Sequence, residues 1–151
     1  MPEQQLIILG DGPLRSALER QADELKLPRN VQFVGAVENP FPWYRSAQAL
    51  VHPARYEGLP NAVLEAMSEG LPVIVSDTQT GLSAIVRNGE TGIVVPSEAV
   101  EDLSKAMISL GKDLAARQRL GAAARNAVAP FWPERAVAAW SRSVFGEDSP
   151  C

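Results

Sequence analysis

Short apolar runs recur along the chain, and each is bounded by glycine, proline or aspartate. Runs of this length between turn-forming residues are typical of β-strands. The pattern therefore predicts strands at residues 6–10, 31–35, 49–53, 72–77 and 92–96.

Segments with helical periodicity separate these strands, at residues 13–25, 42–47, 61–69 and, more briefly, 82–86. The strands are apolar throughout, as strands buried on both faces of a sheet are. The alternation of such strands with helices indicates a parallel sheet. We therefore predict an α/β fold in which helices flank a parallel sheet.

Beyond residue 96 the pattern is helical only, and it predicts helices at 98–110, 113–128 and 133–145. The last helix carries a stripe of apolar side chains, which predicts docking on the body of the protein. A membrane surface is the alternative for that stripe. Its members are Val137, Trp140, Val144 and Phe145.

Composition fits a single globular domain. The chain has 151 residues, of which 46% are hydrophobic and 21% charged, and this length can bury a substantial core. We expect one domain over residues 1–146 and a disordered tail over 147–151, within the polar ending GEDSPC. The one cysteine, Cys151, excludes an intramolecular disulfide and favours a reducing compartment.

The net charge of the chain argues against nucleic acid as a partner. The formal charge is −4 and the sequence pI is about 5.0, whereas nucleic-acid binding favours a basic surface. The start MPEQQLIIL lacks the basic and long apolar parts of a signal peptide, and no run reaches the length of a membrane span. We predict a cytoplasmic protein that binds no nucleic acid, with peripheral membrane contact left open.

Ligands of open parallel sheets bind beyond the carboxyl ends of the strands. The segments to search are therefore 10–13, 35–38, 54–61 and 77–81. In the first, Gly10 and Gly12 resemble the start of a dinucleotide fingerprint, but Arg15 occupies the third glycine position and the next strand ends without an acid. A tight turn with Pro13 at the first helical position is favoured. A dinucleotide-dependent oxidoreductase is the weaker hypothesis.

The stretch RYEGLPNAVLEAM, residues 55–67, holds two acids around a helix start. Glu57 lies in a turn, and Glu65 shares a helix side with the polar Asn61 and Ser68. The helix N-terminus attracts an anion such as phosphate, while carboxylates accept hydrogen bonds from paired sugar hydroxyls. The alternative is that Glu57 is a solvated loop acid and Glu65 favours the helix dipole.

The motifs LIILGDGPLR, VQFVG, ALVHPARYEGLPNAVLEAMSEGLPVIVSD and NGETGIVVP together resemble the C-terminal half of a family 4 (group 1) retaining glycosyltransferase of the GT-B class. The family's two glutamates, with seven residues between them, fall on Glu57 and Glu65. RLGAAARNAV and FWPERAVAAW resemble its closing helices. The resemblance covers nearly the whole chain.

This resemblance implies a Rossmann-like domain that binds a UDP- or GDP-sugar. Transfer of a hexose-type sugar, with retention, would go to a glycan or lipid-linked acceptor held by an N-terminal domain. Cell-surface polysaccharide biosynthesis is the implied setting. No cofactor or metal is implied, and the sequence has no D-x-D motif and one histidine, His52, which we expect to complete a strand end in the core.

The resemblance also implies residue roles. Glu57 would be the catalytic-site acid, facing the hydroxyls of the donor sugar, and Glu65 would hold the ribose. Main-chain groups at Ala36 and Val37 would contact the base. The remaining donor-binding set, near the sugar and diphosphate, is Arg55, Gly58, Leu59, Pro60 and Asn61.

The chain departs from the family pattern in two respects. Ala84 stands where the family usually has an acid. The chain also begins after the family's first C-domain strand, whose following Arg and Lys neutralise the departing diphosphate, and it has no acceptor domain. The alternative function is therefore a truncated, noncatalytic module that binds nucleotide weakly or assembles with a partner chain.

The absent strand would lie between the counterparts of 6–10 and 49–53. A gap there would leave backbone N–H and C=O groups of both neighbouring strands without hydrogen-bond partners. Each buried unsatisfied group costs about 1–3 kcal/mol. We predict that strand 6–10 pairs directly with 49–53, or that another chain, such as a second copy in a homodimer, supplies the strand.

Overall fold

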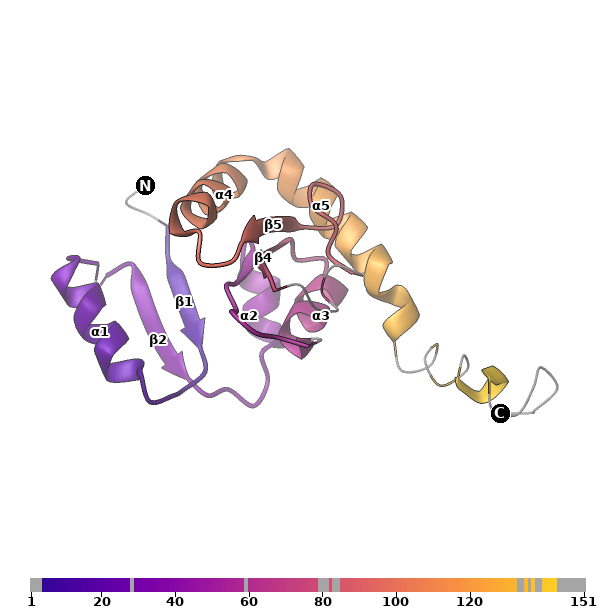
Figure 1. Ribbon diagram of the computed structural model, residues 1–151, viewed down its shortest axis with the longest axis horizontal. Coiled ribbons are helices and arrows are strands. Elements are labelled where there is room, and N and C mark those ends of the chain that lie inside the picture. The colour runs from indigo at the N-terminus through magenta and orange to yellow at the C-terminus, as the bar shows by residue number, and fades with distance from the viewer. Residues whose placement is uncertain are drawn as a thin grey trace. The chain divides into compact units, whose positions relative to one another are not determined.

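The computed structural model describes residues 4–27, 29–58, 60–78, 82, 85–132, 135, 137 and 140–143. The chain divides into two compact units, Met1–Pro40 and Phe41–Cys151 (Figure 1). The two units are described separately.

The first unit is a β-α-β motif. Strands β1 (Leu6–Leu9) and β2 (Val31–Gly35) pair in parallel, and helix α1 (Arg15–Glu24) provides the crossover that a parallel pair needs. The Arg15 guanidinium donates to the Phe33 carbonyl at 3.0 Å and so ties the start of α1 to β2. α1 starts at Arg15 rather than at Pro13, because Gly12 and Pro13 are used in a turn closed by the Arg15 amide and the Gly12 carbonyl.

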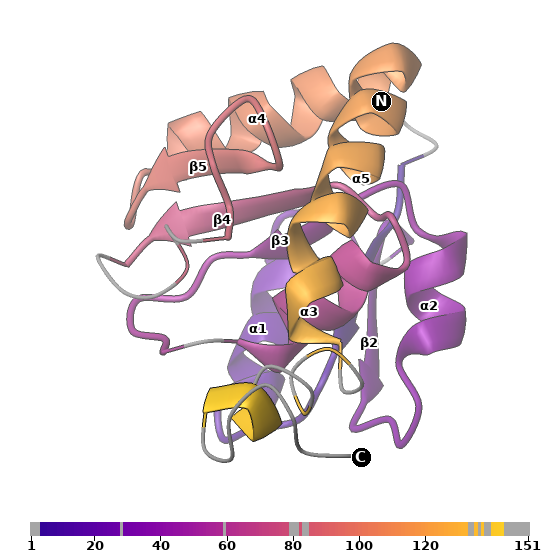
Figure 2. The same ribbon diagram turned by 90° about the vertical axis from the view of Figure 1, so that its right-hand side faces the viewer.

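The second unit is a parallel three-stranded sheet in the order β3-β4-β5, with helices on both faces (Figures 1 and 2). Its elements in chain order are α2 (Phe41–Ser46), β3 (Leu50–His52), α3 (Asn61–Ser68), β4 (Val73–Asp77), β5 (Ile93–Pro96), α4 (Val100–Lys112), α5 (Leu114–Val128) and the 3₁₀ turn η2 (Ala129–Phe131).

The central strand β4 carries the core, because its alternating side chains are buried on both faces. Val73 and Val75 pack with α3, whereas Ile74 packs on the other side with Leu110 of α4 and Leu120 of α5. Each of the three β4 residues is at most 1% exposed. Burial of each such side chain contributes about 1.5–3 kcal/mol, so the sheet and its helices form one stable layer structure.

Helix α5 crosses close to the turn after α3. A Cβ at Gly121 would collide with the carbonyl oxygen of Gly70, so only glycine permits this approach. Gly70 itself has φ +76°, in the left-handed region that favours glycine. These two glycines fix α3 against α5.

The predicted strands and the main helices are confirmed to within about two residues at most of their ends. β4 is buried on both faces as predicted, whereas the residues of β1, β2 and β3 are mostly half-buried. The helix expected from residue 98 starts at Val100, since Glu98 has φ +61°. The segments expected at 82–86 and 133–145 lie partly outside the described residues, and the tail 147–151 lies wholly outside them.

Each unit contains one sheet of described strands, β1-β2 in the first and β3-β4-β5 in the second. Direct pairing of strand 6–10 with 49–53 would join the two units, and it stays a prediction. Supply of a strand by another chain stays a prediction as well.

Candidate functional site

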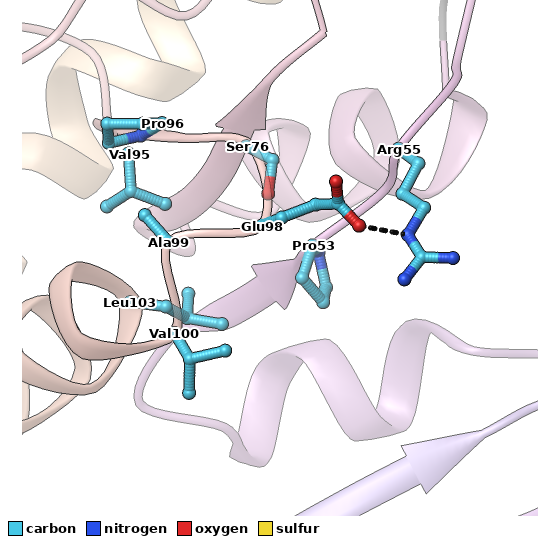
Figure 3. Close-up of a pocket in the computed structure, with 9 residues that line it drawn as sticks. All are labelled: Pro53, Arg55, Ser76, Val95, Pro96, Glu98, Ala99, Val100 and Leu103. Atoms are coloured by element: carbon cyan, nitrogen blue, oxygen red, sulfur yellow. Dashed lines mark ion pairs between the residues drawn. The ribbon is translucent and has the colours of Figure 1, made fainter.

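The carboxyl ends of β3, β4 and β5 surround a cavity of about 330 Å³ (Figure 3). Parallel strands present these ends at the same edge of a sheet, which is where ligands of open α/β sheets bind. The cavity walls are mixed polar and apolar. Its lining residues are Pro53, Arg55, Ser76, Val95, Pro96, Glu98, Ala99, Val100 and Leu103.

An ion pair lies at this cavity. Arg55 Nε and Glu98 Oε1 are 2.9 Å apart, and both side chains are largely exposed, at 74% and 67%. Ser76, which is buried in β4, projects toward the cavity (Figure 3). Because the ion pair is exposed, it contributes little to stability, and the Arg55 guanidinium can exchange Glu98 for an anionic ligand.

Glu57 lies in the loop that follows β3. Its Oε2 is 3.4 Å from Nε2 of His52, the last residue of that strand. The distance suffices for an ion pair when His52 is protonated, but the geometry does not complete a hydrogen bond, and buried Nε2 has no hydrogen-bond partner. The Glu57 carboxylate therefore faces the end of β3, as its place after the strand predicts.

Glu65 lies in the second turn of α3 and is held by α2. The Tyr44 hydroxyl donates to Glu65 Oε2 at 3.1 Å. Burial, reinforced by the negative charge of Glu65, raises the pKa of Tyr44 to about 12, so the phenol remains a donor at neutral pH. Tyr44 is itself fixed by an edge-on contact with Phe41, whose ring centre is 5.9 Å away.

The start of α3 lies between these two acids in sequence. Pro60 precedes the helix and provides no side-chain cap, and Asn61 is exposed. The Val63 and Leu64 amides bond back to the Pro60 carbonyl, at 3.1 and 3.3 Å. The earlier amides have no acceptor inside the helix by its geometry, and they can bind an anion. A Cβ at Gly58 would meet open space, and Leu59 lies outside the described residues.

The structure brings only some of the expected residues together. Arg55 joins the cavity with Ser76 and Glu98. Glu57 lies 3.4 Å from His52 instead, and Glu65 is hydrogen-bonded to Tyr44. Ala36 and Val37 follow β2 in the first unit, as expected, while the other candidates belong to the second unit. Ala84 lies outside the described residues.

Sequence reasoning missed Ser76 and Glu98. The carboxyl-end rule applied to 92–96 indicates the turn that contains Glu98, and Ser76 precedes by one position the searched segment 77–81. Among the described residues, no group of three or more His, Cys, Asp or Glu side chains could hold a metal ion. None of the helices in the described part of the chain is long and apolar enough to cross a membrane.

The family described as glycosyl transferases group 1 matches residues 1–127. The chain is 31% identical over 120 residues to the lipopolysaccharide core biosynthesis glycosyltransferase LpsE of Rhizobium meliloti, which covers 80% of this chain and 35% of that protein. It spans only 15–20% of the length of three other curated relatives.

Two solved structures have a similar fold. Sucrose-phosphate synthase from Thermosynechococcus elongatus matches 96% of this chain and 38% of its own, with a TM-score of 0.83 and 29% identity. Anabaena Alr3699/HepE in complex with UDP-glucose matches 85% of this chain and 36% of its own, with a TM-score of 0.78 and 21% identity.

Proposed function

Because the chain belongs to the group 1 glycosyl transferases, we propose that it is the donor-binding, C-terminal half of a retaining family 4 enzyme. Its parallel sheets flanked by helices match the C-terminal domains of GT-B glycosyltransferases, which confirms the predicted fold class. The proposal rests on one observation above all: Glu57 and Glu65 flank the start of α3 in sequence, Glu57 with its carboxylate 3.4 Å from His52 Nε2 and Glu65 hydrogen-bonded to Tyr44.

The proposed ligand is a UDP- or GDP-sugar. The diphosphate is attracted to the main-chain N–H groups around the start of α3, in the stretch from Gly58 through Pro60 to Asn61. A helix N-terminus carries free donors and a partial positive charge. The Glu57 carboxylate accepts hydrogen bonds from hydroxyls of a hexose-type sugar, and the Glu65 carboxylate accepts them from the ribose. UDP-glucose bound to HepE, which has a similar fold, supports this ligand class.

The other proposed donor contacts depend less on which side chain is present. Main-chain groups at Ala36 and Val37 contact the base, and Arg55 contributes a positive charge from the loop after β3. The chain's own amides and Arg55 meet the diphosphate charge, so the proposal requires no metal ion. Leu59 keeps its proposed place in the donor-binding loop on the basis of sequence alone.

Transfer itself needs a partner. We expect the acceptor, a glycan or lipid-linked sugar of cell-surface polysaccharide, to bind an N-terminal domain or partner chain in the cytoplasm, at or near the membrane. The similarity to LpsE supports this setting. Loss of one preorganised charge donor lowers a rate by about 10²–10³, and residues 1–151 span only 15–20% of the length of three curated relatives. We therefore expect residues 1–151 on their own to bind donor without transferring it.

A truncated, noncatalytic module is the second candidate. The specific observation in its favour is that β3 is an edge strand of the second unit's sheet, in which β4 is its ladder partner. An edge strand can pair with a strand from another chain or from a second copy of this one.

Calorimetric titration with UDP, GDP and UDP-glucose tests donor binding, and NADH serves as the negative control. The proposal expects binding of one nucleoside diphosphate and its sugar, and no binding of NADH. Sugar transfer after mixing with a separately expressed N-terminal half would distinguish the enzyme from the noncatalytic module. Absence of binding to every nucleotide would reject the donor site.

A further inference from the structure

His52 is the only histidine of the chain, and its position is not that of an ordinary core residue. Its ring lies at the carboxyl end of β3, beside the loop that carries Glu57. The Nε2 atom is buried without a hydrogen-bond partner, although buried polar atoms in folded proteins nearly always have one. Glu57 Oε2 lies 3.4 Å from this nitrogen.

The two groups differ in how firmly they are held. His52 belongs to a strand whose residues pair in register with β4, with His52 opposite Val75. Glu57 belongs to a loop without helix or strand, and its neighbour Tyr56 is 91% exposed. A hydrogen bond from N–H to a carboxylate is about 2.7–2.9 Å long. A small movement of the loop, with the ring fixed, is enough to complete it.

The chemistry of His52 and Glu57 indicates which nitrogen of the imidazole carries the proton. A neutral imidazole has one nitrogen that donates and one that accepts. If Nε2 were the acceptor, its lone pair would face a carboxylate oxygen at 3.4 Å, which is repulsive. The proton therefore belongs on Nε2, and the bond would engage only one of the two Glu57 oxygens.

We propose that His52 is a positioning residue, whose Nε2–H fixes Glu57 Oε2 so that the other carboxylate oxygen faces the hydroxyls of a bound sugar. This inference rests on the proposed donor site. It gives the buried nitrogen a partner and gives a loop acid a fixed orientation. It also replaces the expectation that His52 merely completes a strand end in the core.

Two substitutions separate positioning from packing. His52→Leu fills a similar volume without a donor, whereas His52→Gln keeps an N–H that can reach Glu57. Affinity for UDP and for UDP-glucose is measured for both variants and the wild type. We expect His52→Leu to weaken UDP-glucose binding by about tenfold, His52→Gln to restore most of that loss, and UDP affinity to stay the same in all three.

A spectroscopic readout tests the same contact without any ligand. Since the chain has one histidine, its imidazole ¹⁵N and ¹H signals need no assignment among several rings. The inference expects the Nε2–H tautomer in the free protein, and a change of the Nε2 signal in Glu57→Ala. Glu69→Ala, a carboxylate that pairs with Arg45 instead, is the matched control and should leave the signal unchanged.

The outcomes separate the two proposals. Equal UDP-glucose affinity in His52→Leu and wild type, or an Nδ1–H tautomer that is insensitive to Glu57→Ala, would overturn the role of His52. Wild-type protein that binds neither UDP nor UDP-glucose would overturn the donor site, and the spectra of the free proteins would then still decide whether His52 holds Glu57. If His52→Leu fails to fold in a circular-dichroism melt, the Glu57→Ala spectra decide the inference.

Discussion

The two sides of helix α3 differ in what they give the protein. Val63, Ala66 and Met67 are at most 1% exposed and pack in the core with β4 and α5. Asn61 is exposed and Glu65 is half-buried, and the Glu65 carboxylate is bonded to Tyr44 rather than to the core. One side of the helix sets its position, and the other presents polar groups to a ligand.

Because the two sides of α3 differ in burial, substitutions on them should have different effects. Core side chains each contribute about 1.5–3 kcal/mol through removal of apolar surface from water. A half-buried carboxylate with one hydrogen bond contributes less to folding, but it can be a large part of ligand binding. Substitutions on the two sides should therefore separate stability from affinity.

The largest effect is expected from Met67→Ala. Met67 is fully buried, so truncation leaves a cavity and should lower the free energy of unfolding by about 2–5 kcal/mol. Urea denaturation measures this loss, and Met67→Leu, which keeps most of the volume, should cost less than about 1.5 kcal/mol. UDP affinity of the folded variant should be unchanged. A loss of affinity without a loss of stability would contradict the division between the two sides.

Glu65→Ala should show the reverse. Loss of a charge-assisted acceptor is expected to weaken UDP binding by about 1–3 kcal/mol, with a smaller change in unfolding free energy. The control is Glu69→Ala at the C-cap of the same helix, because Glu69 pairs with Arg45 through bonds of 2.8 and 3.0 Å and has no proposed ligand. Equal UDP affinity in the wild type and Glu65→Ala would reject the ribose-binding role.

The fold was largely predictable because its signals are local. Apolar runs bounded by glycine, proline or aspartate gave the strands, and helical periodicity placed Asn61 and Glu65 on the polar side of α3. The start of α4 at Val100 was missed because the positive φ of Glu98 belongs to a turn that no periodicity indicates.

The sequence indicates the two candidate acids but not the contact that Glu65 makes. Glu57 and Glu65 are singled out by their spacing around a turn, whereas Tyr44, the hydrogen-bond partner of Glu65, comes from α2 and is placed by tertiary packing. Glu65 and Tyr44 are 21 positions apart in sequence. Hydrogen bonds over such distances have no sequence period, so the Tyr44–Glu65 contact could not be deduced before the fold was known.

The Tyr44–Glu65 bond can be tested by pH. The pKa of Tyr44 is about 12, raised from 10.0 by burial and by Glu65, so in the unfolded chain the phenol loses its proton at lower pH. The unfolded state then binds fewer protons than the folded state between about pH 10 and 12, and stability falls across that window. Tyr44→Phe should remove this part of the pH dependence.

The titration itself is measurable because the chain has two tyrosines. In Tyr56→Phe, whose altered side chain is 91% exposed in the wild type, the ultraviolet absorbance of tyrosinate reports Tyr44 alone. We expect a midpoint near pH 12, and a lower midpoint when Glu65→Gln removes the neighbouring charge. A midpoint that Glu65→Gln leaves unchanged would show that the carboxylate does not act on Tyr44.

The smallest effect on stability is expected at the cavity, where Arg55 pairs with Glu98. Both side chains are more than half exposed, so Arg55→Ala and Glu98→Gln should each cost less than about 1 kcal/mol of unfolding free energy. Salt should reduce the coupling energy between the two residues that a double-mutant cycle measures.

Arg55 is also a proposed donor contact, so Arg55→Ala should weaken UDP binding while Glu98→Gln does not. The exposed pair Arg87–Glu90, with a separation of 2.7 Å, is the matched control for stability. A loss of several kcal/mol of unfolding free energy in Arg55→Ala with unchanged UDP affinity would contradict this prediction. The ion pair would then act in folding, and Arg55 would have no part in the donor site.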